Sequence, residues 1–343
     1  MLTEEEIPME MKIMKASLLV LAVVLAAMVA GAAAILAGSP KPAEAAFPGK
    51  NGDIIFTNRE FTSESCALAD ISRIHPDGTG LRDLTCNPTL HAYSQYPAWS
   101  ADGKKIVFQN DADDADEFGR DLWVMDANGR NRVNITNTPN VDEWQPAWFP
   151  SGRKVAYVRV GVGGSAGYSA IEVLTLNDRY GSKVTKTTRL TEDGSFPAVS
   201  PNGKRLAFTS DRDGDAEIYV MRTDAREGPN NRPVKLTDNA TYYDSQPDWS
   251  PDGSRIVYVG YRNSNNADDI FVMRADGSGK KNLTRSPARE QYPAFSPDGK
   301  YIVFTSDRGG DQEIWKVRLD GTGLTQVTSD GLRNHQPDWQ PRP

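Results

Sequence analysis

The chain has 343 residues, with 39 lysines and arginines against 46 aspartates and glutamates, which gives a formal net charge of -7. A mildly acidic chain lacks the basic face that nucleic-acid binding requires, so we expect no nucleic-acid partner. Two cysteines and three histidines exclude a disulfide-dense scaffold and leave little room for a cysteine-only zinc site or a histidine-rich metal centre.

The first 46 residues differ in composition from the rest of the chain. Residues 16–38 form an unbroken apolar run that follows Lys12 and Lys15 and precedes the small-residue pattern Ala43-Glu44-Ala45. This order is typical of a secretory signal peptide. The run also approaches the roughly 20 residues that span a bilayer, so an uncleaved N-terminal membrane anchor is the alternative. In either case we expect residues 47–343 outside the cytoplasm, as a periplasmic, secreted or membrane-anchored domain.

One repeated unit fills the remainder of the chain. Its copies are PAWSADGKKIVF from Pro97, PAWFPSGRKVAY from Pro146, PAVSPNGKRLAF from Pro197, PDWSPDGSRIVY from Pro247, PAFSPDGKYIVF from Pro293 and a truncated PDWQP from Pro337. The steps between successive copies are 44 to 51 residues, a period that indicates a propeller or a solenoid.

Each unit predicts four short antiparallel strands. A second apolar segment recurs as DLWVMDANG (121–129), EIYVMRTDA (217–225), DIFVMRADG (269–277) and EIWKVRLDG (313–321), with weaker copies at 70–78 and 170–178. Each unit then ends on Leu-Thr or a variant of it. These segments are short, β-branched and aromatic, and turn residues bound them, as strands require.

The two ends of the repeat region complement each other. The first unit, NGDIIF at 51–56, has no innermost strand before it, and the last element, QPDWQ at 336–340, is an innermost strand with nothing after it. The C-terminal strand is therefore predicted to complete the first blade. The result is an all-β fold, a six-bladed β-propeller of four-stranded antiparallel blades with no open edge, preceded by an N-terminal signal or anchor helix in residues 1–46.

The unit xPxWSPDGkxIxF…EIYVMxxDG…LT resembles the TolB-type propeller repeat, a WD-like repeat family. The resemblance covers residues 49–340 and implies the propeller fold. It extends only to the propeller half of TolB, which carries an α/β domain ahead of its propeller. Prolyl-oligopeptidase-like enzymes carry similar repeats in front of a hydrolase domain, and we expect no such domain after Trp339.

Residues that recur in every blade are expected to serve the fold. Trp99, Trp148, Trp249 and Trp339 are predicted to pack between blades. Asp70, Asp121, Glu217, Asp269 and Glu313 open the third strand of five blades, and Arg59, Arg212, Arg262 and Arg308 follow the second strand of four. Because guanidinium and carboxylate groups pair well, we expect these residues to form ion pairs across the hairpins.

Residues that differ between blades are the candidates for function. The four residues before each innermost-strand proline are predicted to ring one mouth of the central channel. They mix aromatic, acidic, amide and arginine side chains, which suits a protein, peptide or glycan partner better than a lipid. An ordinary solvated rim is the alternative. The residues that we expect to bind the partner are Trp144, Tyr243, Asp244, Arg289, Arg333 and His335.

One acidic loop is a weak candidate for a calcium site. The insertion NDADDADEFGRD at 110–121 contains Asp111, Asp113, Asp114 and Asp116. Calcium prefers such oxygen ligands, although a solvated acidic loop has the same composition. We expect no other cofactor.

The sequence as a whole favours an exported, monomeric, non-catalytic interaction module that binds a partner in the cell envelope. No set of nucleophile, base and orienting residue can be assembled from it. The alternative is a lyase or hydrolase that acts on a carbohydrate or a lactone in the channel. Its carboxylates would come from Asp142, Glu143, Asp244 or Glu290. In an uncleaved chain, residues 16–38 would make the only membrane contact.

The two cysteines are predicted to form a disulfide. Cys66 and Cys86 flank the hairpin-like segment ADISRIHPDGTGLRDLT, whose turn brings the two flanks together. An exported protein meets an oxidising environment, which favours the bond.

Reduction, or a Cys66→Ala/Cys86→Ala double substitution, should lower the free energy of unfolding by about 3 kcal/mol, because the bond restricts the unfolded chain. Urea unfolding with and without reductant measures the loss. If the oxidised protein reacts with a thiol reagent at both cysteines and its stability ignores reductant, the bond does not exist.

Overall fold

The computed structural model describes residues 49–59, 69–86, 93–111, 119–138, 141–161, 169–181, 183–239, 242–262 and 267–342. Residues 44–343 form a compact unit by themselves. Among the described residues, no helix is long and apolar enough to cross a bilayer. The expected signal or anchor segment lies outside the described residues, so its helix and the predicted boundary at residue 46 remain predictions.

Six four-stranded antiparallel sheets make up the described chain, as the sequence predicted. From the channel outwards, blade 1 contains β24 (Arg333–Arg342), β1 (Lys50–Arg59), β2 (Asp70–Ile74) and β3 (Arg82–Asp83). Blade 2 contains β4 (Ser94–Trp99), β5 (Lys105–Asn110), β6 (Asp121–Asp126) and β7 (Val133–Asn134). Blade 3 contains β8 (Val141–Trp148), β9 (Lys154–Gly161), β10 (Ser169–Leu176) and β11 (Val184–Thr191).

The second half of the ring repeats this order. Blade 4 contains β12 (Ser195–Val199), β13 (Arg205–Ser210), β14 (Glu217–Arg222) and β15 (Val234–Lys235). Blade 5 contains β16 (Tyr242–Trp249), β17 (Arg255–Arg262), β18 (Asp268–Arg274) and β19 (Lys281–Asn282). Blade 6 contains β20 (Glu290–Phe295), β21 (Tyr301–Ser306), β22 (Glu313–Arg318) and β23 (Thr325–Gln326). We call the four strands of each blade A to D from the channel outwards.

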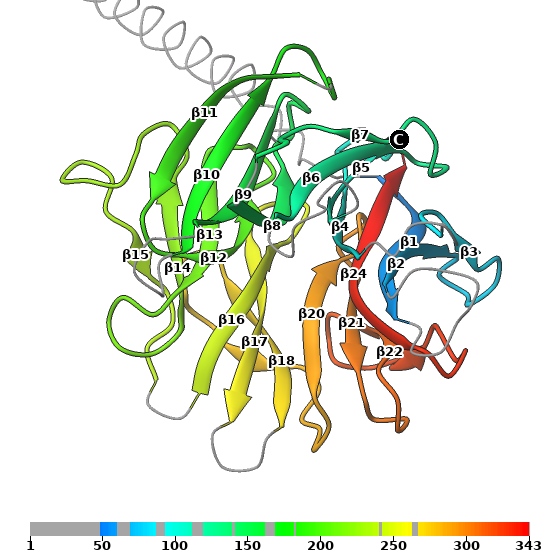
Figure 1. Ribbon diagram of the computed structural model, residues 1–343. Coiled ribbons are helices and arrows are strands. Elements are labelled where there is room, and N and C mark those ends of the chain that lie inside the picture. The colour runs from blue at the N-terminus through cyan, green and yellow to red at the C-terminus, as the bar shows by residue number, and fades with distance from the viewer. Residues whose placement is uncertain are drawn as a thin grey trace, which may run out of the picture. The chain divides into compact units, whose positions relative to one another are not determined.

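The ring closes through its two ends, which confirms the predicted closure. The C-terminal strand β24 pairs antiparallel with β1 from Lys50↔Arg342 to Arg59↔Arg333, and Figure 1 shows the red β24 beside the blue β1. Without β24, β1 would present an unpaired inner edge to the channel.

The A–B turns follow from the recurring Ser-Pro-Asp-Gly sequence. In blade 5, Ser250 Oγ donates to Asp252 Oδ1 over 2.6 Å, and the same oxygen accepts the Ser254 N–H over 3.0 Å. Gly253 has a φ of 67°, in the left-handed region that glycine enters without strain. This local network fixes a tight turn, so strand B returns directly beside strand A.

The hydrophobic core lies between the blades. Trp99 packs with Ile55 and Ile71 of blade 1 and with Ile106 and Phe108 of its own blade. The tryptophans at the equivalent positions, Trp148, Trp249 and Trp339, occupy the same kind of inter-blade cluster. All four are at most 4% exposed, which confirms their predicted packing role.

The carboxylates that open strand C accept a hydrogen bond from a threonine hydroxyl in blades 1 and 2. In blade 1, Thr85 Oγ1 accepts the Ile71 N–H over 2.8 Å and donates to Asp70 over 2.9 Å. Thr136 repeats both contacts in blade 2, with Asp121 as its acceptor. The Thr of the recurring Leu-Thr therefore ties strand D to strand C.

Two of the arginines after strand B bind carboxylates other than the predicted ones, which corrects the expected pairs in blades 4 and 6. The side chain of Arg262 lies outside the described residues, so its predicted pair remains a prediction. Arg308 pairs with Glu290, and Arg212 pairs with Glu227 over 2.7 Å. Glu227 also accepts the hydroxyl of Thr191 in blade 3. Blade 3 has Ala170 where other blades have the strand-C carboxylate, so the C–D loop of blade 4 supplies the missing group to its neighbour.

Candidate functional site

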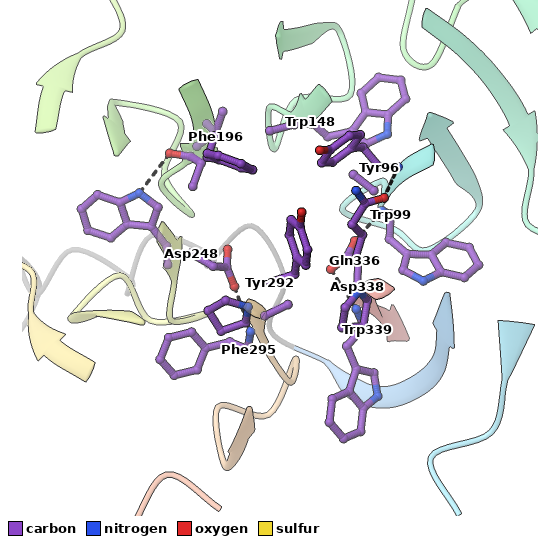
Figure 2. Close-up of a pocket in the computed structure, with 18 of the residues that line it drawn as sticks. Tyr96, Trp99, Trp148, Phe196, Asp248, Tyr292, Phe295, Gln336, Asp338 and Trp339 are labelled. Atoms are coloured by element: carbon purple, nitrogen blue, oxygen red, sulfur yellow. Dashed lines mark hydrogen bonds between the residues drawn. The ribbon is translucent and has the colours of Figure 1, made fainter. Parts of the chain in front are cut away.

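The innermost strands line a central channel with one recurring four-residue stretch. The stretches are YPAW at 96–99, QPAW at 145–148, FPAV at 196–199, QPDW at 246–249, YPAF at 292–295 and QPDW at 336–339. Together with Pro251, Pro297 and Pro341 they enclose a cavity of about 210 Å3. Figure 2 shows this cavity, with the large tryptophans turned away from its centre into the blades.

The first residue of each stretch adopts a strained backbone conformation. Tyr96, Gln145, Phe196, Gln246, Tyr292 and Gln336 have φ values between 50° and 57°. The left-handed region is costly for residues other than glycine. In each A–B pair the ladder register shifts close to this residue, which marks a β-bulge. Bulges re-aim side chains, and Figure 2 shows the rings of Tyr96, Phe196 and Tyr292 directed into the cavity.

These six first residues alternate between aromatic and glutamine around the ring, and the two kinds have different tasks. Each glutamine Oε1 accepts the backbone N–H of the aromatic residue in the next blade. The three distances are 3.0 Å from Tyr96 N to Gln336, 2.7 Å from Phe196 N to Gln145, and 2.6 Å from Tyr292 N to Gln246. The glutamines thus hold neighbouring blades together at the mouth.

The three aromatic rings approach one another over the channel. The ring centroids of Tyr96 and Tyr292 lie 6.2 Å apart, and those of Phe196 and Tyr292 lie 6.3 Å apart. Burial raises the pKa of the Tyr292 hydroxyl, so it stays protonated. The rings therefore form a neutral aromatic collar that narrows one mouth.

Two carboxylates face the same cavity. Asp248 and Asp338 occupy the third position of their stretches, where the other four blades have alanine. Asp248 Oδ2 accepts the Phe295 N–H over 2.8 Å, and Asp338 Oδ2 accepts the Trp99 N–H over 2.6 Å. Each Asp thus binds the next blade's strand A while remaining on the channel wall (Figure 2).

Both carboxyls have raised pKa values. Burial raises the pKa of Asp248 to about 7, and repulsion from Asp338 contributes to the rise. Burial also raises the pKa of Asp338 to about 6. A positive charge in the channel would stabilise the ionised forms of both groups.

The structure places the predicted partner-binding residues around the channel and not in its lining. Tyr243 is 42% exposed, and Arg289 and Arg333 are exposed. Trp144 is half-buried, with the Arg120 guanidinium 4.9 Å from the centre of its ring. These four side chains remain candidates for contacts on the rim.

The other two predicted residues are buried. Asp244 accepts a hydrogen bond from Asn239 over 3.0 Å. Burial raises the pKa of Asp244 to about 7, and the nearby Glu217 carboxylate adds to the rise. The His335 ring packs 6.3 Å from Tyr292. Burial lowers the pKa of His335 to about 3, as does the nearby Arg59, so the imidazole is neutral.

The other carboxylates considered for an enzyme are held apart. Glu143 accepts a hydrogen bond from Thr138 over 2.7 Å, and burial raises its pKa to about 7. Glu290 is fully buried against Arg308. Asp142 accepts the Arg120 N–H over 3.1 Å. Across the described ranges, no three His, Cys, Asp or Glu side chains come close enough together to hold a metal ion.

Two predicted features fall on residues that the structure does not describe. Asp113, Asp114 and Asp116 of the weak calcium candidate lie in 112–118, outside the described residues, while Asp111 accepts the Tyr93 N–H over 2.5 Å. Cys66 of the predicted disulfide also lies outside them. Both features remain predictions.

The channel residues could have been found in the sequence. Reading down the repeats, the position before the proline runs Tyr, Gln, Phe, Gln, Tyr, Gln, and the position after it is Asp twice and Ala four times. The six predicted partner-binding residues lie two to four positions before the proline, whereas the channel lining begins at the position directly before it. The bulge before the proline directs the residue at that position into the channel.

Comparison with known proteins agrees with the propeller fold. The sequence profile described as "TolB beta propeller domain" matches residues 117–265 and 231–343. An uncharacterized protein of Agrobacterium fabrum is 32% identical over 42% of this chain and 45% of its own length. The uncharacterized peptidase YuxL of Bacillus subtilis is 31% identical over 50% of this chain and 30% of its own.

The Tol-Pal system protein TolB of Francisella tularensis is 24% identical over 66% of this chain and 61% of its own length. The crystal structure of TolB from Acinetobacter baumannii superposes with a TM-score of 0.68 at 21% identity, over 86% of this chain and 68% of that one. The matches to the Agrobacterium fabrum protein, to YuxL and to the Francisella tularensis TolB each span less than two thirds of that relative's length.

The channel carboxylates predict an unusual dependence of stability on pH. An ordinary Asp has a pKa of 3.8, and Asp248 reaches about 7 when folded. The folded state therefore binds this proton more tightly than the unfolded chain does, and stability falls as the pH rises from 3.8 towards 7. Asp248→Asn cannot ionise and should remove the part of this fall that Asp248 contributes, while Asp338, Asp244 and Glu143 keep their own parts.

The substitution should raise the free energy of unfolding by about 2 kcal/mol at alkaline pH. This is roughly half of the free energy that the full pKa shift implies, because Asp248 is only half-buried. Near pH 4 the substitution should change the free energy of unfolding by almost nothing. Urea unfolding at the two pH values measures the gain. Asp77→Asn is the control, because a hydrogen bond from Thr79 lowers the pKa of that carboxyl; it should gain nothing. Equal stability of Asp248→Asn and the parent at both pH values would contradict the pKa assignment.

Proposed function

The chain belongs to the family of TolB beta propeller domains, and on that premise we propose that it is an exported, non-catalytic interaction module. Its ligand is an extended peptide segment of a partner protein, bound at the aromatic mouth with one cationic side chain in the channel. Export is supported by the apolar segment at 16–38, which follows Lys12 and Lys15. A distant relationship to a Tol-Pal system protein agrees with a place in the cell envelope.

The observation that carries this proposal is the pair of carboxylates below the aromatic collar. Four blades have alanine in place of Asp248 and Asp338, so the blade itself does not require an acid there. At neutral pH, ionising these half-buried groups opposes folding. A lysine or arginine side chain would offset this cost through charge pairing, and it would also gain from the faces of Tyr96, Phe196 and Tyr292.

The size of the cavity selects the kind of ligand. Its volume is about 210 Å3, below the roughly 300 to 1,000 Å3 of ordinary small-molecule sites. It can take one long side chain, and the rest of the peptide would lie across the rim. There Tyr243, Arg289, Arg333 and Trp144 could contact it.

The alternative, a lyase or hydrolase acting on a carbohydrate or a lactone, receives less support. Asp244, Glu143 and Glu290 are committed to contacts between strands and blades. A sugar ring with its neighbours would also exceed the cavity. The peptidase relative does not alter this balance, because the match covers only 30% of its length.

Photo-crosslinking from the rim tests the proposal. A benzoyl-phenylalanine in place of Tyr243, an exposed aromatic residue, should capture a discrete envelope protein that mass spectrometry identifies. The same group in place of Leu324, which is 41% exposed on the outer edge of blade 6, is the control and should not capture it. When Asp248→Asn is added to the variant that carries benzoyl-phenylalanine at position 243, the yield of the crosslinked partner should fall at least ~10-fold. This is the loss expected when one charge-assisted contact is removed.

A synthetic peptide of the captured segment should then lose affinity to a similar extent when its lysine or arginine is replaced by glutamine. Capture of the same proteins from both positions would contradict binding at the mouth. Capture from the rim alone, with no effect of Asp248→Asn, would leave the mouth as the site and refute insertion of a cation into the channel.

A further inference from the structure

The face opposite the aromatic mouth carries a basic surface that the net charge conceals. We call it the turn face, because it is built from the A–B and C–D turns of the blades. One or two basic residues lie within two positions of the A–B turn glycine in each of five blades: Lys104-Lys105, Arg153-Lys154, Lys204-Arg205, Arg255 and Lys300. Strand B starts at this point in every blade, so all these residues lie on one face of the ring. Lys104, Lys105 and Lys300 pair with carboxylates of the same face, so the excess of cations is greatest at blades 3 and 4.

Two hollows on the turn face concentrate this charge. The larger, between blades 3 and 4, has a volume of about 1,010 Å3. Its charged lining residues are Arg153, Lys154, Lys204, Arg205, Arg222 and a single carboxylate, Asp224. The smaller, between blades 5 and 6, is lined by Arg255, Lys300 and Arg318 with Asp320. Each hollow therefore has an excess of cations.

The strand register of the turn face places like charges opposite each other. Arg205 lies directly across from Arg222, and Arg255 across from Arg274. Such pairs destabilise a sheet. Arg205 is held in place because its guanidinium lies 4.4 Å from the centre of the Trp249 ring. A bound anion would relieve the repulsion in the larger hollow.

The chain enters the propeller on the same face. Lys50, the first residue of β1, pairs with Arg342, the last residue of β24, at the A–B end of blade 1. Ten residues, 39–48, separate the start of the described chain from the apolar run at 16–38. Fully extended, they reach at most ~35 Å. An uncleaved apolar segment would therefore keep the turn face close to the bilayer.

We propose that the turn face docks on the anionic phospholipid headgroups of a membrane, with headgroup phosphates in the hollow between blades 3 and 4. Several cations spread over one face suit a layer of phosphates better than a single soluble anion. The end of the channel that Pro251, Pro297 and Pro341 line would then face the membrane, and the rim at the opposite end would point away from it and stay open to a partner. This proposal uses a different face from the proposed function, so either can fail without the other.

Vesicle co-sedimentation tests the proposal with residues 44–343, which form a compact unit and contain all six closed blades. The protein should sediment with vesicles of equal parts phosphatidylglycerol and phosphatidylcholine and remain in solution with phosphatidylcholine alone. Binding should weaken at high salt. Lys154→Gln/Lys204→Gln/Arg222→Gln should weaken it at least ~10-fold, because each cation near an anionic surface contributes to affinity.

The matched control removes the same charge from the opposite end of the blades. Arg189→Gln/Lys235→Gln/Arg285→Gln should retain the parent's binding, and circular dichroism should show that both variants are folded. Equal loss in the two triple variants, or equal binding to phosphatidylcholine, would overturn the proposal. So would full competition by millimolar inorganic phosphate, which would indicate a soluble-anion site, or tighter binding to a short RNA than to the anionic vesicles.

Discussion

The pairing of β24 with β1 is the constraint on which the rest of this structure depends. It joins the last ten strand residues, Arg333–Arg342, to the first ten, Lys50–Arg59, and so converts a row of blades into a ring. Only in a closed ring do the six innermost strands face one another. The closing strand also brings Gln336 and Asp338 to the channel, so the chain that completes the fold also completes the candidate site.

Departures from the repeat are of two kinds, and the structure separates them. Ala170 in blade 3 removes a carboxylate that other blades use, and Glu227 of blade 4 reaches across to replace it, so the fold is restored. Asp248 and Asp338 instead add carboxylates where four blades have alanine, and burial raises their pKa values. A departure that the neighbouring blade compensates maintains the stability of the fold. A departure that places a carboxylate with a raised pKa on the wall of a cavity indicates a ligand.

Much of the fold could be predicted from the sequence because the same pattern of strands and turns occurs in several copies. The prolines, the turn glycines and the Leu-Thr endings each recur at a fixed place, and the incomplete ends predicted closure. The partners of single side chains could not be read in this way. Spacing suggested that Arg212 and Arg308 would bind the carboxylates of strand C, yet Arg212 binds Glu227 and Arg308 binds Glu290. The channel lining was also missed, because a bulge reverses the alternation of side chains that a regular strand implies.

Hydrogen bonds between neighbouring blades make the channel mouth a preformed ring. Hydrogen exchange at the backbone amides of Tyr96, Phe196 and Tyr292, which donate to the three glutamines, is the decisive measurement. We expect these amides to exchange only through global unfolding, with the same free energy as the amide of Ile55 in β1. Exchange at the rate of the exposed turns would show that the ring opens locally, and a preformed site at the mouth would be contradicted.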